Sequence, residues 1–261
     1  MYQPEKDLLL PVVHDQEKVM VEQPERGIIL HCATRVADNT LQAYFIHKSI
    51  SSTATRNASA EINTPGVRFI LPVTSAISVT GEAAYQFGDW GGSSMRAYGG
   101  YLYGKYATGW TGAAPSSVTV GSILLSGDDE STPEQEGWDP LFSRWPKWSG
   151  SYIYAQAPER APAYWTNLGS LYGRIAFDFS SDIGFIFDYH HLVAPRKGTA
   201  RKAFPGGLGA MRGHLYIGKL SYQIRKNLSG HVLYEGFRPG GFYFDGASGY
   251  GWGRLEVLLT I

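Results

Sequence analysis

The stretch ISVTGEAAYQF at residues 77–87 decides the fold, because its side chains alternate between two kinds. Successive side chains of a β-strand point to opposite faces of the sheet. One face of this stretch would be apolar, formed by Ile77, Val79, Gly81, Ala83, Tyr85 and Phe87. The other would be polar or small, formed by Ser78, Thr80, Glu82, Ala84 and Gln86. A charge-free apolar face of this length is what a lipid-facing strand requires. A soluble β-sandwich shows the same alternation, usually in shorter strands.

The same period of two recurs along most of the chain. It is clear at residues 165–179, 183–190, 228–237 and 251–261, and further candidate strands are 27–36, 41–49, 66–73, 94–107, 117–126, 151–156 and 211–225. Short connections near 180–181 and 226–227 alternate with long ones at 127–150, 194–210 and 239–248. The pattern predicts an all-β protein, an antiparallel up-and-down transmembrane β-barrel of about eleven or twelve strands.

Composition narrows the class of protein. The chain has 32 Gly, 17 Tyr, 12 Phe and 7 Trp among 261 residues, and only 18% of its residues are charged. Lys and Arg balance Asp and Glu at 23 each, which argues against a nucleic-acid partner. The one cysteine, Cys32, excludes an internal disulfide and a multi-cysteine metal site. No apolar run approaches the ~18 residues of a transmembrane helix.

The chain divides into an irregular N-terminal segment, residues 1–26, and a β-barrel, residues 27–261. The first segment has three prolines among many charges and lacks a basic region followed by an apolar run and a cleavage site. These features are not those of a signal peptide, so we do not expect this segment to be one. One hairpin register also follows from the faces. Lys219 would lie opposite Glu235, and Gln223 opposite His231, with Asn227 as the left-handed residue of a three-residue turn.

The polar faces of these strands predict the interior of the barrel. The pore-lining candidates are Glu82, Arg174, Asp178, Asp188, His190, Lys219, His231, Glu235, Arg254 and Glu256. Such residues select solutes by the sign of their charge, or they pair across strands and only fill the interior. The set holds three Lys or Arg residues against five Asp or Glu residues, so it shows no surplus of cations.

Three motifs carry a resemblance to a known family. SGDDESTPEQEGWDPLFSRWPKWSG at 126–150 resembles the signature loop of the alginate-export family of outer-membrane barrels. GEAAYQFGD at 81–89 and NLSGHVLYEGFRPGGF at 227–242 resemble two of its strands. Trp138 and Ser143 depart from the usual Phe and Gly, and Ile261 ends the chain where such barrels commonly have an aromatic residue. The resemblance covers residues 66–261 and implies an incomplete barrel, the C-terminal part of a larger one.

The signature loop supplies further candidates. They are Asp128, Asp129, Asp139, Arg144, Trp145, Lys147 and Trp148. The acidic run 128–130 could bind calcium or form a solvated loop tip, and no metal site is assigned. Arg144 and Lys147 could fold inward and change the charge balance. Trp138, Trp145 and Trp148, with two nearby tyrosines, could stack on sugar rings or join an interfacial aromatic girdle.

These features together predict a channel in the outer membrane of a Gram-negative bacterium. It would pass polar or anionic solutes, including an alginate-like polysaccharide by the family resemblance, without a cofactor and without catalysis. Its partners would be outer-membrane lipid, the barrel-assembly machinery and the solutes. One alternative is a cell-surface carbohydrate-binding or adhesion module that does not conduct. A remote alternative is a barrel lipase that pairs Ser170, Ser221 or Ser229 with His190 or His231.

Overall fold

The computed structural model describes residues 2–3, 25–52, 59–142, 149, 166–197, 207, 209–243 and 245–260. These residues form one antiparallel sheet of twelve strands, in which each strand pairs with the next one in sequence. The strands are β1 (Tyr2–Gln3), β2 (Glu25–Val36), β3 (Asn39–Ile50), β4 (Ala60–Pro72), β5 (Ile77–Trp90), β6 (Ser93–Ala107), β7 (Ser117–Leu125), β8 (Leu168–Asp178), β9 (Ile183–Val193), β10 (Met211–Arg225), β11 (Leu228–Pro239) and β12 (Tyr250–Leu259). Within the described residues, no helix is long and apolar enough to cross a membrane.

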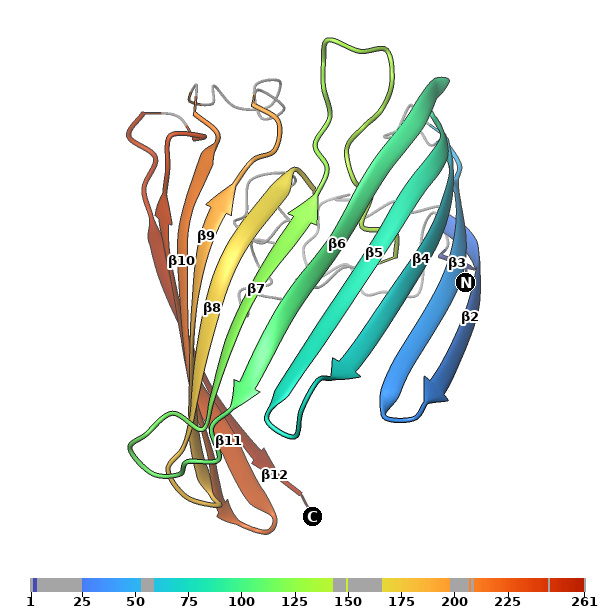
Figure 1. Ribbon diagram of the computed structural model, residues 1–261. Coiled ribbons are helices and arrows are strands. Elements are labelled where there is room, and N and C mark those ends of the chain that lie inside the picture. The colour runs from blue at the N-terminus through green and yellow to red at the C-terminus, as the bar shows by residue number, and fades with distance from the viewer. Residues whose placement is uncertain are drawn as a thin grey trace.

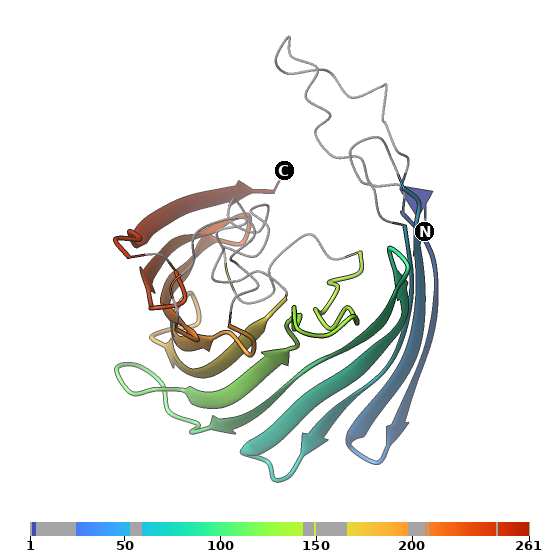
Figure 2. The same ribbon diagram turned by 90° about the horizontal axis from the view of Figure 1, so that it is seen from above.

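The sheet is rolled around a central space. Figure 1 shows the strands as one tilted wall, and Figure 2 shows, from above, that the wall curves around the connection that follows β7. Among the described residues, β12 pairs with neither β1 nor β2, so the barrel is open. The prediction of an all-β, antiparallel, up-and-down barrel is confirmed. The candidate strand at 151–156 lies outside the described residues.

The connections differ between the two rims of the wall. Residues 37–38, 73–76, 108–116, 179–182 and 226–227 connect strands at one end, which we call the short-turn rim. Residues 51–59, 91–92, 126–167, 194–210 and 240–249 connect them at the other end, the long-loop rim. The predicted alternation of short and long connections is present, with two exceptions: the tight turn at 91–92 on the long-loop rim and the nine-residue connection 108–116 on the other.

The outward face of the wall is a continuous apolar surface. Large hydrophobic side chains such as Leu255, 69% exposed, and Ile224, 64% exposed, alternate there with glycines. Six Asp, Glu, Lys or Arg residues of the described strands point outward, all of them near a strand end. Arg225 is the last residue of β10 at the short-turn rim, opposite Leu228. The others lie within four residues of the strand end at the long-loop rim: Arg26, Glu61, Asp89, Arg96 and Arg238. A soluble protein rarely exposes so large an apolar surface, whereas a transmembrane barrel requires one.

The register of the β10–β11 hairpin corrects one prediction. Lys219 lies opposite Leu233, and Gln223 lies opposite Ser229, two residues away from the predicted partners. The turn contains two residues, and a bulge between Gln223 and Arg225 takes up the difference. Asn227 does not have the positive φ that a left-handed turn residue would need. Because side chains repeat every two residues along a strand, this shift leaves the predicted faces unchanged.

Candidate functional site

The inward face of the wall carries all ten residues that the sequence analysis named as pore-lining candidates. The strand registers place Arg174 opposite Asp188 and His231 opposite Glu256, and the buried alternate positions of each strand define the inward side. The remaining candidates share that side: Glu82, Asp178, His190, Lys219, Glu235 and Arg254. Their role as a pore lining stays a prediction.

Several of these residues pair with one another across strands. Arg174 and Asp188 form a two-point ion pair, in which Nη2 of Arg174 donates to Oδ2 of Asp188 over 2.7 Å. Nε of Arg254 donates to Nε2 of His231 over 3.0 Å, and Nδ1 of the same imidazole lies 3.3 Å from the Glu256 carboxylate. This part of the interior therefore fits the alternative in which opposite charges pair and fill space.

The inward face also carries cations that the sequence analysis did not name. Position parity within each strand places Arg35, Lys48, Arg68 and Lys105 there. Arg212 joins them through its full burial, at a register shift between Met211 and Gly213. Inward Lys and Arg residues then number eight, counted up to the β10 bulge, against six inward Asp and Glu residues, which include Glu25. The ten candidates alone show no surplus of cations, whereas the inward strand positions taken together do. Alternation along β2, β3, β4 and β6 carries the signal for four of these cations, whereas Arg212 needs the register shift in β10.

Five of the eight inward cations have no carboxylate within ion-pair distance in the described part of the chain: Arg35, Arg68, Lys105, Lys219 and Arg254. Arg68 instead donates to neutral groups, the Tyr101 hydroxyl at 3.0 Å and the Gln42 amide oxygen at 3.2 Å. Inward carboxylates without an ion pair in the same residues are Glu82, which accepts from the Tyr44 hydroxyl at 2.8 Å, and Asp178. The unpaired charge on the inward face is therefore positive on balance.

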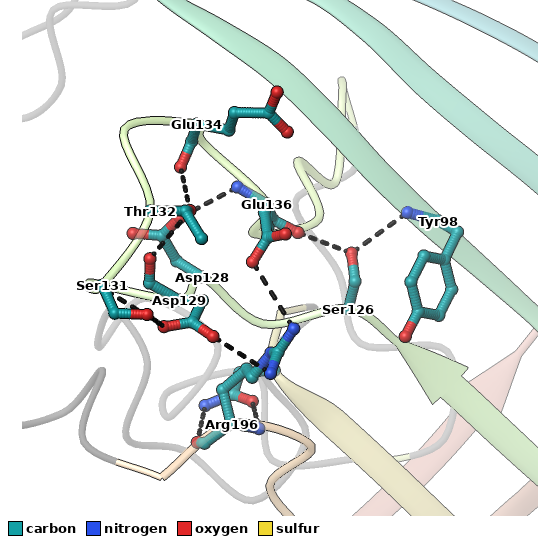
Figure 3. A network of polar contacts seen from close by, with 10 residues as sticks. Tyr98, Ser126, Asp128, Asp129, Ser131, Thr132, Glu134, Glu136 and Arg196 are labelled. Carbon is teal, nitrogen blue, oxygen red and sulfur yellow. Dashed lines mark hydrogen bonds and ion pairs between the residues drawn. The ribbon is translucent and has the colours of Figure 1, made fainter.

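The connection after β7 turns into the interior and first completes the wall. β6 extends six residues beyond its pairing with β7, and Gln135 pairs with the exposed edge through a bridge to Met95. The Gln135 amide donates to the Ser94 carbonyl over 2.9 Å, and the Arg96 amide donates to the Gln135 carbonyl over 2.9 Å. Ser126 also joins the loop to β6, because the Tyr98 amide donates to its hydroxyl over 3.0 Å (Figure 3).

A buried lysine holds the loop against the opposite side of the wall. Nζ of Lys48, 2% exposed, lies 2.9 Å from Oδ1 of Asp139 and 3.2 Å from Oε1 of Glu25. It also donates to the Leu141 carbonyl over 2.7 Å, where Leu141 has a φ of +58°. Buried charges are stable only when they are paired and hydrogen-bonded, and this ammonium has three oxygen partners.

Neighbouring contacts fix the same segment in position. The Gln86 side chain, fully buried on β5, forms two hydrogen bonds with the backbone of Asp139, donating over 2.8 Å and accepting over 2.9 Å. The Trp138 ring lies against Gly99 and packs against two hydrophobic clusters, one that contains Leu125 and one that contains Leu141. Trp138 therefore packs inside the wall and is not part of an outer girdle, while its stacking on a sugar stays a prediction.

The acidic tip of the loop is tied to the connection after β9. Arg196 lies 3.1 Å from Oδ2 of Asp129 and 3.6 Å from the Glu136 carboxylate, and its backbone pairs with the Asn167 side chain through two hydrogen bonds of 2.8 Å (Figure 3). Asp128 accepts from the Glu136 amide over 2.9 Å. These carboxylates organise the loop, and among the described residues no group of metal ligands is assembled.

The pKa of Asp129 reflects that role. Hydrogen bonds from the Ser131 hydroxyl and amide lower the pKa of this carboxyl, and the nearby Arg196 guanidinium lowers it further. The ionised form is therefore favoured in the folded loop.

On the far side of the interior, Ser149 donates to both oxygens of the buried Glu235, each over 2.8 Å. Arg144, Trp145, Lys147 and Trp148 lie outside the described residues.

The interior is packed at the long-loop rim and accessible towards the short-turn rim. Along β6, Met95 and Ala97 are buried, Tyr101 and Tyr103 are half-buried, and Lys105 is exposed. β8 shows the same gradient, from Leu168 at 2% to the Arg174 side chain at 45%. The loop thus fills one half of the interior, and the charged and tyrosine side chains line the other half.

One serine–histidine pair is present on the inward face. The Ser170 hydroxyl lies 3.1 Å from Nδ1 of His190, and both side chains are buried. Asp188, the nearest carboxylate along β9, is engaged by Arg174. In the described residues, no carboxylate orients this imidazole as a Ser-His-Asp triad would require.

Comparisons with known proteins leave the family open. No protein-family model and no curated protein matches the sequence. A solved structure described as "KdgM porin" is similar to the chain with a TM-score of 0.33 and 14% sequence identity, over 82% of this chain and 85% of that chain. The resemblance to the alginate-export family stays a prediction.

Proposed function

We propose that the chain forms the wall and the interior loop of an outer-membrane channel. Polar or anionic solutes would pass through this channel without chemical change. The observation that carries this proposal is the separation of charge between the two faces. The outward face is apolar between its two rims, whereas the inward face carries eight cationic and six anionic side chains of the strands. Lipid favours the first surface, and a water-filled passage favours the second.

The sign of the unpaired charge favours an anionic solute. Arg68, Lys105 and Lys219 lack an ion pair among the described residues and lie on the accessible part of the inward face or next to it. Charged rings of this kind select against ions of the same sign. The family resemblance adds an alginate-like polysaccharide, whose carboxylates such a surface would attract. Export from a Gram-negative cell is the direction that the resemblance implies.

Planar-bilayer recordings test the channel and its selectivity together. In a salt gradient, the reversal potential should indicate anion preference, and the triple substitution of Arg68, Lys105 and Lys219 by Gln should move it towards cation preference. Arg174→Ala should move it in the same direction, because it exposes the Asp188 carboxylate. Arg238→Gln, on the outward face, is the matched control and should leave it unchanged.

Two results would contradict the proposal. A chain that stays soluble and monomeric without detergent would not have a lipid-facing surface. If neither Arg174→Ala nor the triple substitution changes the reversal potential, the inward face does not line the ion pathway. For the solute, alginate oligomers should block the current transiently, whereas neutral glucose oligomers of equal length should not.

A further inference from the structure

A row of basic side chains crosses the outward face of three adjacent strands. The register places His191 of β9 directly opposite His214 of β10, and His214 directly opposite Arg238 of β11. All three point outward, because the buried alternate positions of these strands lie on the inward side. Neighbouring strands lie about 4.8 Å apart, so the row is about 10 Å long.

The row lies at the level where lipid headgroups would lie. Each of its members is within four residues of the strand end at the long-loop rim. The next outward row towards the short-turn rim contains Tyr189 and Tyr216, whose rings are 5.4 Å apart. Tyrosines mark the boundary between hydrocarbon and headgroups in membrane barrels. The basic side chains are therefore on the headgroup side of that boundary.

The row has free hydrogen-bonding capacity. The Arg238 side chain is exposed and has no hydrogen bond or ion pair within the described residues. His214 uses Nδ1 for the Tyr189 hydroxyl at 2.7 Å, which leaves Nε2 available. The His191 ring lies 5.3 Å from the His214 ring, and its contact is with that ring only in the described part of the chain.

Within the described residues, no acidic side chain on the neighbouring outward positions balances the basic row. The outward positions of the described strands β8 to β12 contain no Asp or Glu. The opposite part of the wall differs, since outward-facing His47 lies 3.2 Å from the Glu61 carboxylate. A bare basic row at headgroup level, beside an aromatic boundary, is complementary to a phosphate group.

We propose that His191, His214 and Arg238 bind the phosphate of an anionic lipid headgroup on the membrane-facing side of the wall. This inference rests on the proposed location in a membrane. Arg238 supplies a guanidinium that can hold two phosphate oxygens, and the imidazoles supply ring N–H donors. The lipid belongs to the leaflet on the long-loop side, which is the external leaflet in barrels of this kind.

Native mass spectrometry of the detergent-solubilised full chain tests the site without requiring insertion into a bilayer. The wild-type chain should retain phosphatidylglycerol in preference to phosphatidylcholine. Arg238→Gln should weaken that retention about fivefold, as expected for one basic residue near an anionic lipid surface. The triple variant with His191→Gln, His214→Gln and Arg238→Gln should show no preference. His47→Gln is the matched control, because that outward histidine already has a carboxylate partner.

The outcomes separate this inference from the channel proposal. Equal phosphatidylglycerol retention by the wild-type chain and the folded triple variant, with folding checked by circular dichroism, would overturn the lipid site. Full displacement of the lipid by millimolar inorganic phosphate would also overturn it, because the site would then recognise free phosphate. A chain that retains phosphatidylglycerol but conducts no ions would support the site and contradict the channel.

Discussion

The ammonium of Lys48 lies 2.9 Å from the carboxylate of Asp139, a residue 91 positions later in the sequence. This pair joins the wall to the loop that fills half of the interior, and the Lys48 side chain is 2% exposed. We therefore expect Lys48→Met to lower the free energy of unfolding by about 3–5 kcal/mol, because it leaves the Glu25 and Asp139 carboxylates without their cation. Urea unfolding in detergent measures this change.

The control for Lys48 is another inward lysine. Lys105→Met, at an exposed position without an ion pair in the described residues, should change the free energy of unfolding by less than about 0.5 kcal/mol. Adding Asp139→Asn to Lys48→Met should recover part of the lost stability. Equal unfolding midpoints for the two lysine variants would show that the loop is held elsewhere.

The packing of Trp138 can be tested through two glycines of one strand. A Cβ atom on Gly99 would lie 2.9 Å from the Trp138 ring and 2.9 Å from Leu125, whereas one on Gly104 would have no neighbour within 4 Å. Gly99→Ala should therefore cost about 1–3 kcal/mol of stability and displace the loop. Gly104→Ala should leave the stability nearly unchanged. Thermal unfolding of both variants measures this difference. Similar melting temperatures for Gly99→Ala and Gly104→Ala would contradict the contact between Trp138 and β6.

The β10–β11 register makes a prediction about cross-linking. Cysteines at 219 and 233 lie at directly opposed positions, whereas cysteines at 219 and 235 are related diagonally. Opposed Cα atoms in an antiparallel pair are about 4.5–5.5 Å apart, within the range of a disulfide, and diagonal ones are farther. Oxidation of a Cys32→Ser background should therefore link the first pair in higher yield. A higher yield for the 219–235 pair would instead support the register predicted from the sequence, in which Lys219 lies opposite Glu235.

Acid should loosen the loop tip through Asp129. The pKa of Asp129 is lowered from its ordinary value of 3.8, so its contribution to loop stability is present above that value. The contribution is lost as the pH falls through the lowered pKa, because the protonated carboxyl no longer attracts Arg196. NMR titration of the aspartate carboxyls should show a raised pKa for Asp129 in Ser131→Ala. An unchanged pKa in that variant would contradict the proposed hydrogen bonds.

The sequence predicted the faces of the strands because alternation is a local property. Glu82, Arg174 and Lys219 share one side of the wall for the same reason that their apolar neighbours share the other. Alternation also survived the error in the β10–β11 hairpin, since the bulge at Gln223 shifts the register by an even number of residues. The strand β4 began earlier than predicted, because Pro65 lies within it where the ladder to β5 is interrupted.

The site itself depended on contacts that local patterns do not contain. Two of the three oxygen partners of Lys48 come from the loop after β7, and the third is Glu25 of β2, so its burial depends on tertiary packing. Gly99 and Gly104 obscured the face contrast in β6, and Arg68 on β4 was left unassigned. The ten candidates therefore understate the positive charge of the interior, because five cations and one anion, Glu25, lie on the same face.

The bridge between Gln135 and Met95 has a mechanical consequence for the interior loop. Backbone groups of Ser94 and Arg96 obtain their hydrogen bonds from Gln135, in a stretch of β6 that β7 does not reach. Swinging the whole loop aside as a flap would strip those groups of their partners at the edge of the sheet, which is costly beside lipid. A movement that widens the passage must therefore pivot beyond Gln135, and the first part of the loop stays fixed as a piece of the frame.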